Sequence, residues 1–400
     1  MKKIIKTNTK EILYFIGYFL MGLSSVVIGN SYLFGTKRFL ICEIVQYISV
    51  AFFLLSFIKD KYKIEKLLSI ILIGVVVFFS TIAMHDIAFG LYGLSVIGAT
   101  HIDIRKIVKN SVINNIVFLI IVIVPAILGL IPDDIYHHEN MIAHGLGFAY
   151  YSNMPCIVFL CTIAIYWLIK SKIVERIFLI VSIPVHILVY KISTVRLVFY
   201  LYILFLVFAV VFDKTNKQKQ HKFLRWIATV MYPIMAAFIF IVTFMFEKFR
   251  ALSAFNAAIN FRLSFNLQGF QKYGIRLLGQ KIVTEAEHID FNFINHYFYI
   301  DCGYVYMLIG YGIILFIIIM MIYILLSRYA VAKNDMKLFC WCLVICIFST
   351  INNIMFVTTL NPLPIIGFNL IINNYVKLKK RKNNKLYKIC QNAATEKYKK

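Results

Sequence analysis

Long apolar stretches separated by short polar segments follow one another along most of the chain. A helix needs about 20 apolar residues to cross roughly 30 Å of hydrocarbon, and eight of the stretches have about this length. They cover residues 11–29, 39–58, 67–83, 112–131, 145–169, 226–246, 303–327 and 338–358. Each is therefore predicted to be a membrane-spanning helix.

Three further stretches need separate interpretation. Residues 177–212 are apolar except for an interruption at 191–196, and their length fits two short spans joined by a tight turn. Residues 88–100 and 365–376 are short for a full crossing, but counting them keeps the Lys-rich and Arg-rich connections on one side. The pattern thus predicts an all-α polytopic integral membrane protein with about twelve transmembrane helices.

Basic residues are distributed unevenly over the connections of this arrangement. Of the 42 Lys and Arg residues, 32 lie in the termini and the even-numbered connections, and 10 lie elsewhere. Because short cytoplasmic loops carry the excess of Lys and Arg, we expect both termini in the cytoplasm. The basic tail 377–400 is expected to lie on the anionic headgroups of the inner leaflet.

Composition agrees with this interpretation and excludes another class of protein. Hydrophobic residues make up 61% of the 400 residues, charged residues make up 15%, and the mean hydropathy is +0.81. These values exclude a water-soluble enzyme with one large core. The net charge of +24 follows the membrane topology, so we expect a lipid bilayer and no nucleic acid as partner.

One connection, residues 247–302, is far longer than a turn requires, and long loops usually carry function. Its first half, 252–270, mixes apolar residues with Asn, Arg and Gln, as in a helix lying on the membrane surface. Gly274 and Gly279 then break this helix. The chain is thus expected to form a single membrane domain, 1–400, with a large extracytoplasmic loop.

Motifs for metals and cofactors are missing from the sequence. It contains no glycine-rich phosphate loop, no paired Cys-x-x-Cys, no HExxH and no nucleophile elbow, so we expect no metal and no cofactor. Cys340, Cys342 and Cys346 are expected to pack within one helix, whereas Cys302 is expected to face outward. The intramembrane groups Glu43, His85, Asp86 and His186 are scattered without pairing at helical spacing, which argues against a proton relay.

Basic residues on the outward side are the first candidates for chemistry. Lys191 and Arg196 lie in the predicted turn between two spans, where they either contact lipid phosphates or hold the anionic group of a substrate. Arg262 and Arg276 flank the surface helix and its glycine breaks, and Arg250 lies nearby. Because guanidinium groups bind phosphate oxygens through paired hydrogen bonds, several arginines at one membrane face fit a lipid-linked pyrophosphate.

Two outward segments add titratable and polar groups. His296 and Asp301 immediately precede the span that begins at 303, and either could accept a proton from a hydroxyl. An aromatic interface belt is the alternative, and it accounts for Tyr304 but not for His296 or Asp301. Between His144 and Asn153, glycines interrupt an apolar run and either line a protein cavity or pack closely.

Together these segments resemble the Wzy-type polymerases of O-antigen, capsule and exopolysaccharide repeat units. The similarity covers most of the chain loosely and depends on the order and placement of its pieces. They are Leu146-Gly147-Phe148 with Asn153, Ser193-Thr194-Val195-Arg196, Arg262 through Gly279, Asp301 through Gly312, and Asn361-Pro362. The chain departs from the family pattern in lacking a proline before Asn153 and in having Cys302 where Asn or Ser is usual.

The resemblance implies metal-independent glycosyl transfer on the outer face of the bacterial cytoplasmic membrane. Undecaprenyl-diphosphate-linked oligosaccharides would be donor and acceptor, and a chain-length regulator and a flippase of the same pathway would be partners. Arg196, Arg262 and Arg276 would stabilise the leaving diphosphate. His296 is favoured as the base, with Asp301 orienting the acceptor sugar or capping the next helix. The substrate-binding candidates are Lys191, His144, Asn153, Arg250 and Tyr304.

Two other functions stay open at this point. A ligase that moves the lipid-linked glycan to another acceptor would need much the same site. A flippase for lipid-linked oligosaccharides would need a charged central cavity and no long loop, and the sequence indicates the opposite.

Overall fold

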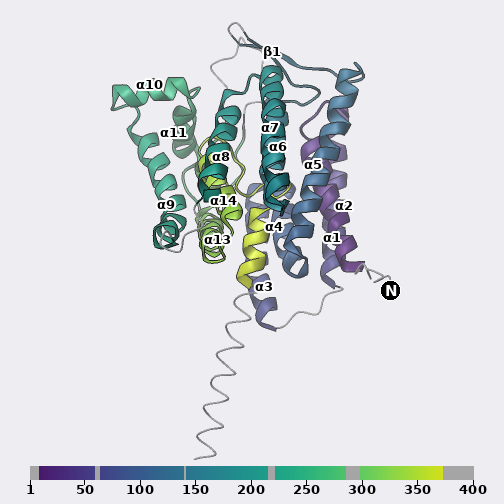
Figure 1. The fold of residues 1–400 in the computed structure, drawn as a ribbon. Helices are drawn as coiled ribbons and strands as arrows, with labels where there is room; N and C mark the ends of the chain where they lie inside the picture. The colour runs from purple at the N-terminus through teal and green to yellow at the C-terminus, as the bar shows by residue number, and fades with distance from the viewer. Residues whose placement is uncertain (1–8, 59–63, 139–140, 215–220, 285–297, 373–400) are drawn as a thin grey trace, which may run out of the picture.

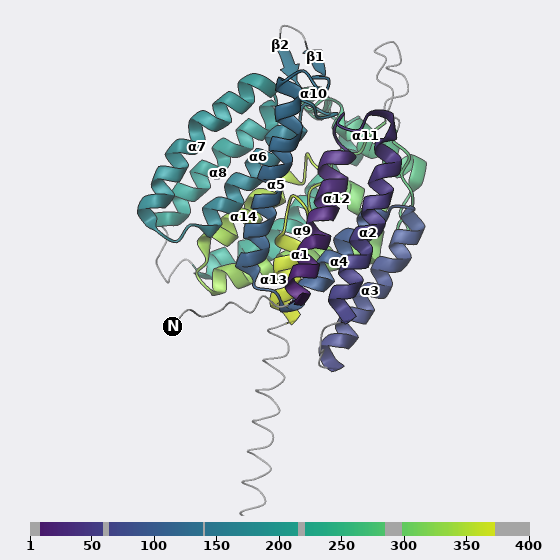
Figure 2. The same cartoon turned by 90° about the vertical axis from the view of Figure 1, so that its right-hand side faces the viewer.

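The computed structural model of the protein describes residues 9–58, 64–138, 141–214, 221–284 and 298–372. Within these ranges helices dominate, and one antiparallel hairpin pairs Ile135–His138 (β1) with Met141–His144 (β2). The long helices stand side by side in one bundle, with β1 and α10 at one end and the start of α1 at the other (Figures 1 and 2).

The helices differ widely in length. In chain order they are α1 (Thr9–Gly22) continued by η1 (Leu23–Ile28), α2 (Arg38–Ile58), α3 (Ile64–Met84), α4 (Ile87–Gly98), α5 (Ile104–Ile127), α6 (Asn153–Leu168), α7 (Lys172–Ser193), α8 (Arg196–Lys214), α9 (His221–Met245), α10 (Arg250–Ala258), α11 (Arg262–Tyr273), α12 (Gly303–Tyr306) continued by η5 (Met307–Tyr311), α13 (Ile313–Ala332) and α14 (Met336–Phe348). A final apolar helix covers Leu363–Ile372.

Six helical segments of the described chain are long and apolar enough to cross a membrane, and six shorter apolar helices accompany them. Many of their large apolar side chains face outward, and Leu72, Ile173 and Ile180 are 70%, 73% and 67% exposed. Apolar surface of this extent requires a lipid environment. The protein is therefore an all-α membrane protein.

Each predicted apolar stretch overlaps one of these helices, and residues 177–212 overlap two, as predicted. The turn between α7 and α8 uses Thr194 in the left-handed conformation, with φ of 54°. Several helix starts differ from the prediction, and α5, for example, begins at Ile104 instead of 112. Helix α6 begins at Asn153 instead of 145, because Leu146 and Gly147 have φ of 46° and 85° and cannot be helical.

Two predicted spans are interrupted. The span 303–327 breaks at Gly312, whose φ is 87°, and helix α13 begins after it. The span 338–358 ends early, because α14 stops at Phe348 and no regular helix resumes before Leu363. The intervening residues 349–362, called the irregular segment below, lie within the bundle with half or more of their side chains buried.

Side chains from distant helices satisfy the backbone of the irregular segment. The hydroxyl of Tyr18 donates to the carbonyl of Thr358 at 2.6 Å, and that of Tyr323 donates to Met355 at 2.7 Å. Asn115 Nδ2 donates to the carbonyl of Thr359 at 3.0 Å. Non-helical backbone at membrane depth is stable only when the protein supplies such partners. These bonds therefore stabilise the non-helical conformation of the irregular segment.

A second contact of backbone with backbone fixes the break at Gly312. The N–H of Ile313 donates to Arg276 O at 3.0 Å, and the N–H of Gln280 donates to Gly310 O at 2.9 Å. A Cβ on Gly312 would lie 2.3 Å from Gly279 N, and one on Gly279 would lie 2.1 Å from Gly310 O. Both positions therefore require glycine, and they dock residues 274–280 onto the start of α13.

The predicted surface helix 252–270 is two helices, because Asn260 and Phe261 both have positive φ (57° and 58°). Asn256 joins them: its Oδ1 accepts from the N–H of Leu263 at 2.9 Å, and its Nδ2 donates to Ser264 Oγ at 2.7 Å. Helix α10 lies across the direction of α9, at the same end of the bundle as the β hairpin (Figure 1).

An ionic cluster joins the α6–α7 turn to the α13–α14 turn. Lys337 Nζ lies 2.6 Å from Glu175 Oε2, and Glu175 is only 3% exposed. Lys337 also donates to the carbonyl of Ile169 at 2.8 Å. Trp167 Nε1 donates to Asp335 Oδ2 at 3.1 Å. These contacts fix helices α6 and α7 against α13 and α14.

The hydrophobic core surrounds α14, which packs against α6, α8, α9 and α13. Trp341, Cys340, Cys342 and Cys346 are each 0–1% exposed, so the expected packing of the three cysteines is confirmed. The expectation for Cys302 is wrong. Its side chain is 1% exposed and its thiol donates to Ser349 O at 3.7 Å, because the segment before α12 packs against the irregular segment.

Candidate functional site

An arginine–carboxylate pair forms the centre of the candidate site. Arg262 opens helix α11, and Asp301 lies two residues before α12. Arg262 Nε lies 2.9 Å from Asp301 Oδ2, and their side chains are 21% and 33% exposed. The structure thus brings together two of the five residues that the sequence nominated for chemistry, although 38 intervening residues separate them in the chain.

The segment that carries Asp301 is packed onto the irregular segment. The N–H of Gly303 donates to the carbonyl of Ser349 at 2.8 Å. A Cβ on Gly303 would lie 2.9 Å from the carbonyl oxygen of Asn352 and 3.4 Å from Cα of Asn353. Glycine at 303 therefore permits a backbone approach that places Asn352 and Asn353 beside Gly303, two residues after Asp301.

Helix α6 completes the site through its first turn. Asn352 Nδ2 donates to Cys156 Sγ at 3.7 Å, and Cys156 lies within electrostatic range of both Arg262 and Asp301. Asn153 begins the same helix one turn before Cys156. We call the set Asn153, Arg262, Asp301, Asn352 and Asn353 the polar centre.

Apart from Arg262 Nε, which faces Asp301 Oδ2 in the ion pair, three buried polar atoms in the polar centre have no hydrogen-bond partner among the described residues. They are Arg262 Nη1, Asn153 Nδ2 and Asn353 Oδ1. Leaving a buried donor or acceptor unpaired costs about 1–3 kcal/mol, so such atoms are rare without a ligand or water. The polar centre therefore offers two donors and one acceptor to a polar ligand.

Electrostatics at Asp301 reflect two opposing effects. Burial raises the pKa of the Asp301 carboxyl above its ordinary value, and the Arg262 guanidinium beside it acts in the opposite direction. The net direction is upward. The carboxylate is therefore a stronger base than an exposed aspartate while it still carries a charge-assisted contact with arginine.

The other predicted cations lie at the surface. Arg196 opens α8 and is exposed, as is Lys191 in the last turn of α7. Arg250 opens α10 and is exposed. Arg276 is exposed beside the Gly279–Gly312 contact. Among these arginines, Arg262 is the one that pairs with Asp301.

Two predicted binding residues make contacts inside the protein. Tyr304 is 0% exposed and its hydroxyl donates to Cys346 O at 2.9 Å, so it is a core residue and not a surface for substrate. His144 ends β2, and its Nδ1 lies 2.7 Å from Asp133 Oδ2. Asp133 Oδ1 also accepts from the N–H of Leu146 at 2.6 Å, which supports the turn before α6. His144 thus has a described structural partner.

His296, the favoured base, lies outside the described residues, as do the tail 377–400 and part of the predicted loop. The sequence reasoning also missed two residues of the polar centre, Asn352 and Asn353. They lie in a stretch that hydropathy assigns to a span. One feature of the sequence could have identified these two residues. Polar residues are frequent between Ser349 and Asn361, and a membrane-spanning helix of this length tolerates them poorly.

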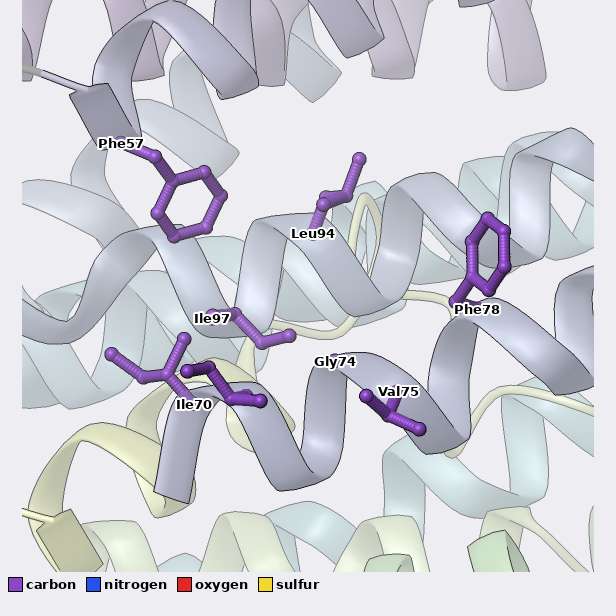
Figure 3. Close-up of a pocket in the computed structure, with 8 residues that line it drawn as sticks. Phe57, Ile70, Gly74, Val75, Phe78, Leu94 and Ile97 are labelled. Atoms are coloured by element: carbon purple, nitrogen blue, oxygen red, sulfur yellow. The ribbon is translucent and has the colours of Figure 1, made fainter. Parts of the chain in front are cut away.

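An apolar groove of about 340 Å³ lies between α2, α3 and α4 (Figure 3). Phe57, Ile70, Phe78, Leu94 and Ile97 line it together with other apolar residues. The groove has no titratable lining residue and belongs to the lipid-facing side of α3, where Leu72 and Phe79 are also exposed. It can hold a hydrocarbon chain but cannot carry out acid–base chemistry.

No group of three or more His, Cys, Asp or Glu side chains that could hold a metal ion occurs in the described residues. The fold and the site together define a polytopic helical membrane protein. Its half-buried arginine–carboxylate pair lies beside the irregular segment between its C-terminal helices. Comparison with models of protein families, with curated proteins and with solved structures finds no match.

Proposed function

We propose that the protein polymerises lipid-diphosphate-linked oligosaccharide repeat units into a long surface polysaccharide. The observation that carries the proposal is the half-buried Arg262–Asp301 pair with three unpaired polar atoms around it. An arginine with a free Nη1 donor suits a phosphate oxygen, and a carboxylate of raised basicity suits a sugar hydroxyl. A glycosyl transfer from a diphosphate requires both groups near one another.

The chemistry follows from charge. When the glycosyl bond to the donor phosphate breaks, negative charge develops on the leaving diphosphate, and Arg262 stabilises it through N–H donors in a site with little water. The acceptor hydroxyl loses its proton as its oxygen attacks the donor carbon. Asp301 or His296 accepts that proton, and the sequence resemblance to Wzy-type polymerases supports the same division of roles.

The proposed topology has twelve spans, both termini in the cytoplasm and the polar centre on the outer side of a bacterial cytoplasmic membrane. The count of basic residues supports this orientation. In it, helices α10 and α11 belong to the extracytoplasmic loop. The hydrocarbon tail of a polyprenyl substrate would lie against lipid-facing grooves such as the one between α2, α3 and α4.

Deletion of the chain followed by analysis of surface glycan tests the proposal. A polymerase defect leaves single repeat units on the lipid carrier and on the surface, and re-expression of the wild-type chain restores long polymer. Long lipid-linked chains that fail to reach their acceptor would instead identify a ligase. Unchanged glycan would remove the proposal altogether. Re-expression of Arg262→Ala at equal protein level is the matched control for the site.

A further inference from the structure

The turn between α3 and α4 carries a carboxylate that the reaction described above does not use. Asp86 precedes α4, and its Oδ1 accepts from the N–H groups of Ala88 at 2.9 Å and Phe89 at 3.4 Å. The residue before it, His85, has φ of 53°. Capping explains the position of one carboxylate oxygen. It does not explain why three aromatic hydroxyls lie within electrostatic range of the group.

Three phenols lie within electrostatic range of the Asp86 carboxylate. They belong to Tyr92 of α4 and to Tyr306 and Tyr311 of the α12–η5 segment. Ring contacts confirm that the two elements meet: Phe89 and Tyr311 centroids are 4.5 Å apart, and Tyr306 and Tyr311 are 5.5 Å apart in an edge arrangement. The first turn of α4 therefore packs directly on η5.

The same tyrosines connect Asp86 to the polar centre. The side chain of Asn353 interacts with the phenol of Tyr311, and Cα of Asn353 lies 3.4 Å from the position of a Cβ on Gly303. Asp301 is two residues before Gly303. Asn353, whose Oδ1 has no partner among the described residues, thus lies next to Gly303 at the start of the α12–η5 segment and interacts with Tyr311 at its end.

The cation of Arg262 and the carboxylate of Asp86 lie in different parts of the site and suit different parts of a substrate. An anionic diphosphate is attracted to Arg262 and repelled by an unpaired carboxylate, so Asp86 does not suit the phosphate end of a substrate. Carboxylates, amides and phenols beside aromatic rings are good hydrogen-bonding partners for neutral sugar hydroxyls. Asp86 and its tyrosines therefore suit the saccharide and Arg262 suits the phosphate.

We propose that Asp86, with Tyr306 and Asn353, binds hydroxyl groups of the saccharide in a subsite distinct from the phosphate-binding Arg262. The inference rests on the proposed function, because that function supplies the saccharide as substrate. It adds a residue from the N-terminal half of the chain to a site otherwise built from later segments and from α6.

The test uses Asp86→Asn and Asp103→Asn as a matched pair in the full-length protein. Asp103 caps α5 as Asp86 caps α4, with Oδ1 accepting from Arg105 N at 2.7 Å and Lys106 N at 3.3 Å. Asparagine caps as well as aspartate, so both variants keep the helix start and lose one negative charge. The α5 cap is exposed.

The binding probe is a soluble oligosaccharide made by partial hydrolysis of the cell's own surface polysaccharide, without lipid or phosphate. Its affinity for purified wild-type protein is compared with that for the variants. Asp86→Asn should weaken binding about tenfold or more, because the neutral amide accepts a weaker hydrogen bond than the charged carboxylate, whereas Asp103→Asn should bind as wild type. Tyr306→Phe, which keeps the ring, should weaken binding by about threefold.

Polyprenyl diphosphate without sugar is the second probe, and it should distinguish the two subsites. Its binding should fall in Arg262→Ala and stay unchanged in Asp86→Asn. Saccharide binding that is absent in wild type, or equal in wild type and Asp86→Asn, overturns the inference. Failure of the proposed function would be seen in a different experiment: the surface glycan would be unchanged after deletion of the chain.

Discussion

Lys337 Nζ lies 2.6 Å from Glu175 Oε2, and the carboxylate is almost entirely buried between two interhelical turns. A buried charge that loses its partner is strongly destabilising, whereas an exposed pair contributes little. This one contact therefore gives a direct measure of how α6–α7 and α13–α14 depend on each other.

Replacement of Glu175 should destabilise the protein without touching the polar centre. Glu175→Ala leaves Lys337 unpaired and should lower the free energy of unfolding by about 3–5 kcal/mol, seen as a lower Tm in detergent. Lys172→Ala, at an exposed position 3.4 Å from the same carboxylate, should cost less than about 1 kcal/mol. Equal losses in both variants would contradict the assignment of Lys337 as the main partner.

Arg262 should matter more to polymer synthesis than the exposed arginines. Arg262→Ala should lower the rate of polymerisation about 100-fold at unchanged protein level, because a donor to the leaving diphosphate is removed. Arg262→Lys should recover little, since a point charge does not replace the guanidinium fork. Arg225→Ala, at an exposed position of α9 that is not a candidate for the site, is the control.

Arg196→Ala and Arg276→Ala are predicted to reduce long-chain polymer as well, but by smaller factors because both side chains are exposed. Polymer length in cells that express each variant provides the comparison. The hypothesis of a diphosphate site would be wrong if polymer were normal in all three alanine variants, those of Arg196, Arg262 and Arg276.

The pH dependence of the rate should identify the base. Because burial raises the pKa of Asp301 and Arg262 opposes it, removing the cation in Arg262→Gln raises that pKa further. If ionised Asp301 is required, activity is lost as pH falls through its pKa. The acid limb should then move to higher pH in Arg262→Gln.

His296 gives a different profile. An unperturbed imidazole titrates near pH 6.5, so a limb at that pH that disappears in His296→Gln and does not respond to Arg262→Gln would assign the base to His296. Asp301→Asn separates the roles further. It keeps hydrogen bonding by the side chain but removes the carboxylate.

Gly312 should tolerate no side chain. Its φ of 87° strains any other residue, and a Cβ would lie 2.3 Å from Gly279 N, so Gly312→Ala should cost about 2 kcal/mol or more in unfolding free energy. Gly274→Ala is a matched control, since its φ is also positive but a Cβ there meets nothing within 4 Å. Comparable thermal stability of the two variants would show that the Gly279–Gly312 contact is dispensable.

Thiol labelling tests the membrane orientation. An impermeant reagent should modify Ser253→Cys of α10 in intact cells and should leave Lys222→Cys of α9 unmodified until the membrane is opened. Both positions are exposed in the structure, and among the described cysteines only Cys42 is not buried, so Cys42→Ser together with Cys390→Ser provides a clean background. External labelling of Lys222→Cys would overturn the twelve-span topology.

Hydropathy predicted where the helices lie, because lipid-facing helices must be apolar over a length that the bilayer sets. The turn at Thr194 was also predictable, since polar residues interrupt an otherwise apolar stretch at that point. Arg262 and Asp301 were identified as candidates from their residue types and their place near a membrane face. Their pairing was not, because it depends on how α11 meets the segment before α12.

The polar residues between Ser349 and Asn361 were a local signal for the break after Phe348, but the side chains that stabilise the break could not be predicted from the sequence. Residues 349–362 are stable without a helix only because partners such as Tyr18, 340 positions away from Thr358, complete their hydrogen bonds. Tyr304 shows the opposite limitation. Its place in a motif suggested substrate binding, but its hydroxyl donates to Cys346 in the core.

The irregular segment has a consequence for biosynthesis. Tyr18, Ser111, Asn115 and Tyr323, which donate to its carbonyls, all lie earlier in the chain. A ribosome therefore completes and inserts those helices before the residues that they must hold have been made. Until synthesis passes Asn361, the donors must bond to water, to lipid or to a membrane insertase. In a nascent chain stopped before residue 349, these donors would lack their carbonyl partners. Such a chain would be a natural substrate for membrane quality control.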